Sequence, residues 1–173
     1  MKTEINTRQL AIGFTVLALG AIFYYFFRPV EHTYFLQLLE NNPNKHTSLA
    51  PLYVTIGNSL PTFIHVLAFA LITAGLITRQ KMGYMIVCLF WFTVDALFEV
   101  GQALTLNETI IKIIPNWFSD FLILENSKNY FLHGHYDWFD MLSIALGSMA
   151  AYVLLIKTRH EGEKHERKIT FNY

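Results

Sequence analysis

Charge is what this sequence has least of. Only 15% of its 173 residues are Asp, Glu, Lys or Arg, against about 25% in an average soluble domain. The formal net charge is zero, so no overall field attracts nucleic acid. A single cysteine, Cys88, excludes an internal disulfide and leaves the redox compartment undetermined. The short fingerprints of serine hydrolases, zinc proteases, P-loop enzymes and dinucleotide-binding domains are missing as well.

Long apolar runs take the place of charge. Hydrophobic residues make up 53% of the chain, and about 20 consecutive apolar residues suffice to cross a bilayer as a helix. The runs predict an all-α integral membrane bundle of four transmembrane helices, at about 9–27, 60–78, 82–102 and 138–157. Pro61 is suited to the start of the second helix. The membrane domain then covers 1–158, and 159–173 is a charged tail.

The first run could instead be a signal peptide. No small-x-small cleavage site follows it, and it ends in the bulky sequence YYFFRP, so we interpret it as an uncleaved helix.

Orientation follows from the basic residues in short flanks. Lys2 and Arg8 precede the first helix, Arg79 and Lys81 bracket the turn between the second and third, and the tail carries five more Lys and Arg. Four crossings put all three clusters on one side. The sequence therefore predicts a bacterial plasma-membrane protein with both termini in the cytoplasm.

The two long segments between helices then lie outside. Residues 33–39 and 109–124 are rich in Leu, Ile, Phe and Trp but too broken to span, which predicts short interfacial helices. Whether these helices rest on lipid or cap the bundle stays open at this point.

Polar residues gather at one depth in three of the helices. Asp95, Glu99 and Gln102 follow an i, i+4, i+7 spacing and share a narrow arc of the third helix. Glu99 lies about 10 Å outside the midplane and Asp95 about 4 Å. The fourth helix and the second bring further polar side chains to the same outer layer: Asp137, Asp140, Ser143 and His65.

A charge imbalance results, because no Lys or Arg lies in helices two to four at that depth. An ionised carboxylate facing lipid costs several kcal/mol, so these groups should face the bundle interior and find partners there. Either a carboxylate is protonated, or a cation reaches the site: a metal ion, a cationic ligand group or His65. Simpler roles stay open, since Asp137 and Asp140 can cap the fourth helix and His65 can be an ordinary buried histidine.

The segment 132–137 raises the question of a metal. His133, His135 and Asp137 could ligate zinc, but H-x-H without a further fixed ligand is a weak pattern, and a turn at Gly134 is the simpler interpretation. A divalent cation is the only cofactor that the sequence suggests.

With these residues the chain resembles the VanZ-like family of small bacterial membrane proteins. The resemblance consists of FIHVLAF around His65, Glu99 three residues before Gln102, and D-x-x-D at Asp137 and Asp140 running into a helix with Gly147. It covers about residues 60–156. The family's P-G-R segment after the glutamine is missing, and 103–136 is a long apolar insertion. The resemblance implies a link to low-level glycopeptide resistance or envelope maintenance, without a mechanism.

Two classes of function are compatible with this pattern. The chain is either a non-enzymatic protein that binds a lipid-linked envelope ligand through the outer carboxylates, or an intramembrane enzyme with carboxylate–histidine acid–base chemistry. A small transporter is a third alternative, and it would require an oligomer. Binding is favoured, because no nucleophile with an adjacent base is visible. Expected partners are the lipid bilayer and a lipid-linked small molecule, with no nucleic acid.

The predicted topology can be tested by labelling. Cysteine introduced by Asn44→Cys or Ser127→Cys should react with an impermeant thiol reagent on intact cells, because both positions lie in outer segments. Gln80→Cys, in the basic turn, is the control and should react only after lysis. Labelling of the outer positions only after lysis would reverse the topology.

Overall fold

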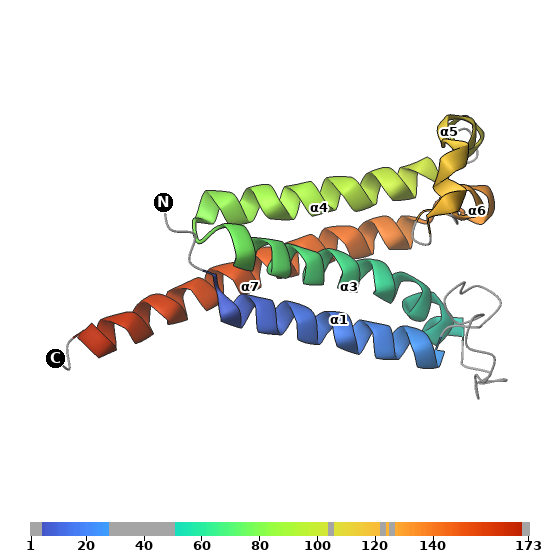
Figure 1. Cartoon of the computed structure of the whole chain (residues 1–173). Helices are drawn as coiled ribbons and strands as arrows, with labels where there is room; N and C mark the ends of the chain where they lie inside the picture. Colours follow the sequence, from blue (N-terminus) through green and yellow to red (C-terminus); the bar gives the residue numbers. More distant parts are fainter. Residues whose placement is uncertain (1–4, 28–50, 104–105, 122–123, 125–126, 171–173) are drawn as a thin grey trace.

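Apolar helices form the body of the protein in the computed structural model (Figure 1), which describes residues 5–27, 51–103, 106–121, 124 and 127–170. The side chains of residues 24–27, 51–58, 129, 133 and 160–170 are outside the description. The long helices are α1 (Thr7–Phe27), α3 (Pro51–Ile77), α4 (Lys81–Gly101) and α7 (Trp138–Thr170). The short ones are α5 (Asn107–Ile113), η2 (Asn116–Asp120) and α6 (Ser127–His133). No strand occurs in these ranges, so the all-helical fold class is confirmed for them.

Helix α3 is the centre of the bundle. It packs against α1 on one side and against α7 and α4 on the other, and α7 also packs on α4. Small residues at the contacts, such as Ala70, Ala74 and Ala151, let the helix backbones approach closely. The remaining members of this core are Leu67, Leu71, Tyr84, Val87, Cys88 and Leu155.

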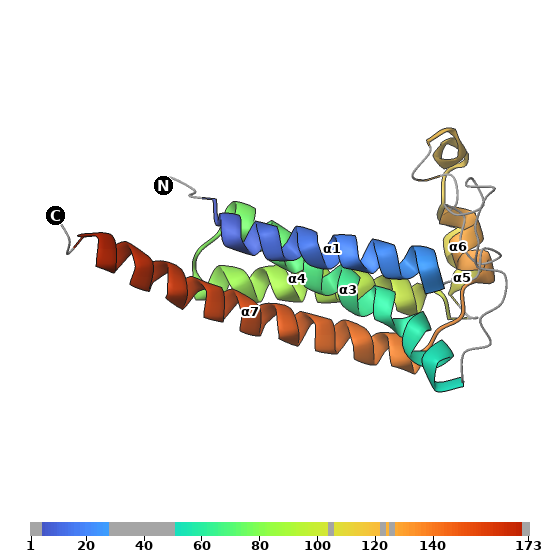
Figure 2. The ribbon, with the colours of Figure 1, turned by 90° about the horizontal axis from the view of Figure 1, so that it is seen from below.

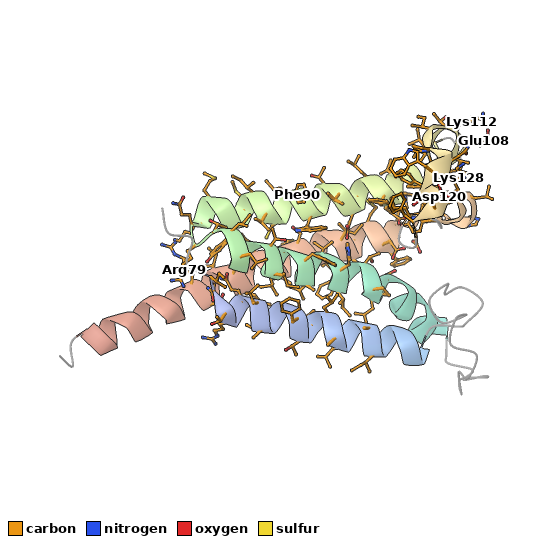
Figure 3. All side chains as sticks on the ribbon, in the orientation of Figure 1. Arg79, Phe90, Glu108, Lys112, Asp120 and Lys128 are labelled. Atoms are coloured by element: carbon orange, nitrogen blue, oxygen red, sulfur yellow. The ribbon has the colours of Figure 1, made fainter. Side chains whose placement is uncertain are left out.

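Three helices are long and apolar enough to cross a membrane within the described residues: Ser59–Ile77, Lys81–Gly101 and Trp138–Arg159. The described apolar part of α1, Thr7–Phe23, is shorter than these three. Figure 3 shows the distribution of charge along the bundle: Arg79 lies at one end, and Glu108, Lys112, Asp120 and Lys128 lie at the other. Phe90 projects outward from α4 between the two ends and is 56% exposed, as expected of a side chain that faces lipid.

Two helix boundaries differ from the prediction. Helix α3 begins at Pro51 and not at residue 60, so the expected helix start at Pro61 is wrong and this proline lies inside the helix. Pro51 takes the first helical position, where a missing N–H costs nothing. Helix α7 continues past residue 157 to Thr170, because the Glu, Lys and Arg residues of this segment are good helix formers.

The segment between α4 and α7 contains short helices. Helix α5 and the 3₁₀ helix η2 lie within or beside the predicted interfacial stretch 109–124, whereas α6 was not expected. Figures 1 and 2 place α5 and α6 at the end of the bundle opposite to the beginning of α1 and the end of α7. The expected helix at 33–39 lies outside the described residues.

A buried glutamine joins the helices at the other end. The side chain of Gln9 on α1 is fully buried, and its Nε2 lies 3.1 Å from the hydroxyl of Tyr84, 3.0 Å from Thr158 Oγ1 and 3.3 Å from the Leu155 carbonyl. Gln9 therefore connects α1 to α4 and α7 through neutral groups. The sequence alone indicates only that Gln9 lies at the beginning of the first apolar run.

Gly147 marks a close approach of α7 to α3. A Cβ at this position would lie 2.7 Å from the backbone oxygen of Phe63, which cannot move independently of its helix. We expect Gly147→Ala to lower the free energy of unfolding by about 1–3 kcal/mol through overpacking. Met149→Ala, on the exposed face of α7, should leave it nearly unchanged. Thermal unfolding in detergent measures both; equal stability of the two variants would contradict this close contact.

Candidate functional site

A cavity of about 640 Å³ lies toward the end of the bundle that carries α5 and α6. Its apolar lining includes Pro61 from α3, Val94 from α4 and Ile144 from α7. Its aromatic lining consists of Trp91, Phe98, Tyr130 and Phe131, and its polar lining consists of Thr62, His65, Asp95, Glu99 and Ser127. The volume is within the range of small-molecule sites, about 300–1,000 Å³.

The polar arc of α4 faces the interior, as its spacing predicts. Asp95, Glu99 and Gln102 retain only 9%, 4% and 8% of their accessible surface. Leu97 and Phe98 beside them are 65% and 50% exposed, so the helix presents one polar face inward and an apolar face outward. This arrangement removes the carboxylates from lipid.

Asp95 pairs with His65 across the α3–α4 contact. The Nδ1 atom of His65 lies 2.7 Å from Oδ2 of Asp95, a distance at which the ring N–H donates to a carboxylate. The Asp95 side chain is 10% exposed, whereas that of His65 is 44% exposed. The histidine thus shields the deepest carboxylate and keeps part of its own ring at the open side of the cavity.

Glu99 is held by two neutral donors. Its Oε1 accepts from the backbone N–H of Asp137 at 2.6 Å, and its Oε2 accepts from Gln102 Nε2 at 3.2 Å. Gln102 Nε2 also donates to the hydroxyl of Tyr130 at 2.7 Å. This chain of hydrogen bonds fixes α6 and the start of α7 against the C-terminal end of α4.

The two aspartates before and in α7 have different roles. Asp137 Oδ1 accepts from the backbone N–H of Phe139 at 2.9 Å, which caps the beginning of α7. Asp140 Oδ1 instead accepts from Thr62 Oγ1 at 3.3 Å and so joins α7 to α3. Ser143 is half-buried and is not among the residues that line the cavity.

Aromatic rings support the histidine. The His65 ring lies 4.4 Å from that of Phe69 and 5.8 Å from that of Trp91, centroid to centroid. Trp91 is itself fixed, because its Nε1 donates to Thr73 Oγ1 at 3.0 Å. The orientation of His65 is therefore set by Asp95 on one side and by packed rings on the other.

No group of three or more His, Cys, Asp or Glu residues is arranged to hold a metal ion in the described part of the chain. His135 is exposed, and the side chain of His133 lies outside the description, so the proposed pair stays a prediction. Gly134 between them follows α6 directly. A Cβ there would contact the Gln102 side-chain oxygen and lie 2.6 Å from the Tyr130 carbonyl, which explains a glycine at this close approach.

Sequence reasoning missed the contribution of α6. Tyr130 and Phe131 line the cavity, and Tyr130 hydrogen-bonds to Gln102. The adjacent aromatic residues in a polar context, SKNYFLH, were the available signal. A helix of seven residues is too short for hydrophobic periodicity to identify it reliably.

Comparisons of this chain with protein-family models, with curated proteins and with solved structures gave no match. The resemblance to VanZ-like proteins accordingly stays a prediction from the residues quoted above.

The His65–Asp95 contact can be tested by a double-mutant cycle. We expect His65→Phe and Asp95→Asn each to destabilise the protein, and the double variant to lose less than their sum by about 0.5–3 kcal/mol. Thr93→Ala replaces His65→Phe in the control cycle, because Thr93 is exposed and bonds to its own helix at Leu89. Additive effects in both cycles would show that the two side chains do not interact.

Proposed function

We propose that this chain is a four-span protein of a bacterial plasma membrane, with both termini cytoplasmic, that binds an amphipathic lipid-linked ligand in the cavity between α3, α4, α6 and α7. The observation that carries this proposal is the composition of the cavity. Aromatic and aliphatic side chains line most of it, and a histidine and two carboxylates lie on the same wall. Such a lining matches a ligand with one apolar and one polar part.

A fourth span is supported by the length and position of α1. Its 21 residues correspond to about 31 Å, which equals the thickness of the bilayer hydrocarbon. The helix packs against α3, with close approaches at Gly13 and Gly20 of α1. The stretch from Gln9 to Phe27 contains no charged residue.

The cavity's position favours a ligand that enters from the membrane. Its lining runs from Pro61 to His65 on α3 and from Trp91 to Glu99 on α4, which is the half of each span nearer to α5 and α6. The 44% exposure of the His65 side chain supports access to this part of the cavity from outside the protein. A lipid in the outer leaflet would bring its headgroup to this depth.

The VanZ-like resemblance adds the cell envelope as the context of the ligand. On this proposal the protein would act on envelope maintenance, or on the response to glycopeptides, by sequestering or presenting a lipid-linked molecule. An oligomer is compatible with this function but is not needed for it.

A second candidate function, catalysis, is favoured by one specific observation. The carboxylate of Asp95 holds Nδ1 of His65, which would leave Nε2 as the basic ring atom, as in general-base pairs of hydrolases. Binding ranks first, because the cavity and its charges account for it without a nucleophile or a bound metal. Turnover of a lipid by purified protein would reverse this order.

Filling the cavity should abolish ligand retention. Val94 lines the cavity, whereas Leu97, on the same helix, is 65% exposed on the outer face. We expect Val94→Phe to lose most of the lipid that gently extracted wild-type protein retains in native mass spectrometry, and the matched Leu97→Phe to retain it. Equal retention by both variants, at equal accumulation in the membrane, would contradict a binding function for the cavity.

A further inference from the structure

The described lining of the cavity has more acidic than basic side chains. Asp95 and Glu99 line the cavity together with His65, and no Lys or Arg is among the described residues that do so. A protonated His65 would balance Asp95, its direct partner. Among the described residues, both donors that hold Glu99 are neutral: the Gln102 amide and the Asp137 backbone N–H.

A further acidic residue lies next to Glu99, because the backbone N–H that donates to Glu99 Oε1 is that of Asp137. Two donors also leave a carboxylate with unused acceptor capacity, since its two oxygens offer about four lone-pair sites. Glu99 can therefore accept a further hydrogen bond from a cation in the cavity.

Aromatic rings form the rest of the wall near Glu99. Phe98, Tyr130 and Phe131 lie against one another, with centroid distances of 5.2–6.2 Å, and all three line the cavity. Trp91 lines it on the side of His65. The faces of aromatic rings attract cations, and rings together with carboxylates are the usual surroundings of bound ammonium groups.

The arrangement suits an organic cation better than a metal ion. Calcium needs six to eight oxygens at 2.3–2.6 Å and magnesium needs near-octahedral geometry. The described carboxylates do not converge in that way, since no group of three metal-binding side chains occurs among them. An ammonium group needs only a few acceptors and tolerates apolar rings around it.

We propose that the polar end of the ligand is an ammonium group, held by Glu99 and by the aromatic rings of Phe98, Tyr130 and Phe131. This inference rests on the proposed binding function and names the chemistry of its ligand. The ammonium can belong to a lipid headgroup or to a soluble amine.

The test compares lipids that differ in the ammonium alone. Full-length protein is reconstituted in nanodiscs of phosphatidylglycerol that contain equal small fractions of phosphatidylethanolamine and N-acetyl-phosphatidylethanolamine with distinguishable acyl chains. Native mass spectrometry of the released protein then gives the ratio of the two retained lipids. We expect at least a tenfold preference for phosphatidylethanolamine, because acetylation removes the charge and leaves the phosphate and the acyl chains in place. No preference, or preference for the acetylated lipid, would overturn the proposal.

Two variants and a control locate the effect. Glu99→Gln should reduce the preference to less than threefold, because the amide keeps the size of the side chain without its charge. Asp120→Asn removes a carboxylate at the same end of the protein that does not line the cavity, and it should keep the wild-type ratio. Unchanged preference in Glu99→Gln would overturn the assignment of the ammonium to Glu99. If this variant fails to accumulate, Phe98→Leu tests the aromatic part, and its expected result is a severalfold lower preference.

Two further measurements distinguish a lipid headgroup from a soluble amine, and the ammonium proposal from the proposed binding function. Soluble ethanolamine at millimolar concentration should not displace the lipid if the ammonium is that of a headgroup, and full displacement would assign the site to a soluble amine. Equal retention of all lipids, abolished by Val94→Phe, would overturn the ammonium proposal and leave binding in the cavity intact. Retention that Val94→Phe does not change would overturn both.

Discussion

The cost of placing a carboxylate in hydrocarbon determines how this bundle is assembled. Helix α4 carries Asp95, Glu99 and Gln102 on one face, and only burial between neighbouring helices keeps that face out of lipid. Each group obtains its partner from a different element: His65 on α3, the backbone of Asp137 before α7, and Tyr130 on α6. The order and rotation of these elements around α4 follow from that requirement, and the apolar contacts at the other end are compatible with it.

The two ends of the bundle solve the problem of buried polar groups in different ways. Near the beginning of α1, Gln9 hydrogen-bonds to Tyr84 and Thr158. All three side chains are neutral and buried. Near α5 and α6, ionisable side chains surround an open cavity with the partly exposed His65 at its side. A neutral, closed junction is what stability alone favours, since unpaired buried charge is expensive. Stability of packing therefore does not explain why ionisable side chains surround an open cavity at the α5–α6 end.

The sequence alone predicts the long helices and the polar face of α4. Hydrophobic run length identifies the helices, and the i, i+4, i+7 spacing identifies the inward face of α4, because both depend only on local geometry. Sequence could not show that Asp95 takes His65 as its partner, or that Asp140 bonds to Thr62, because those choices depend on how α3 and α7 rotate against α4. The sequence also placed the start of this helix at Pro61, whereas α3 begins at Pro51. Both prolines suit a first helical position, so the sequence does not distinguish between them. Helix α6 was missed because seven residues carry too little periodicity.

The length of α7 has a structural consequence. The helix runs unbroken for 33 residues, about 50 Å, whereas the hydrocarbon core is about 30 Å thick. Its first turn is attached to the site, because the backbone of Asp137 bonds to Glu99 and Asp140 bonds to Thr62. Helix α7 contains no internal proline, which is one of the usual causes of a sharp kink. The site and Thr170 therefore lie on one continuous helix, which joins the cavity to the far side of the bundle without an intervening loop.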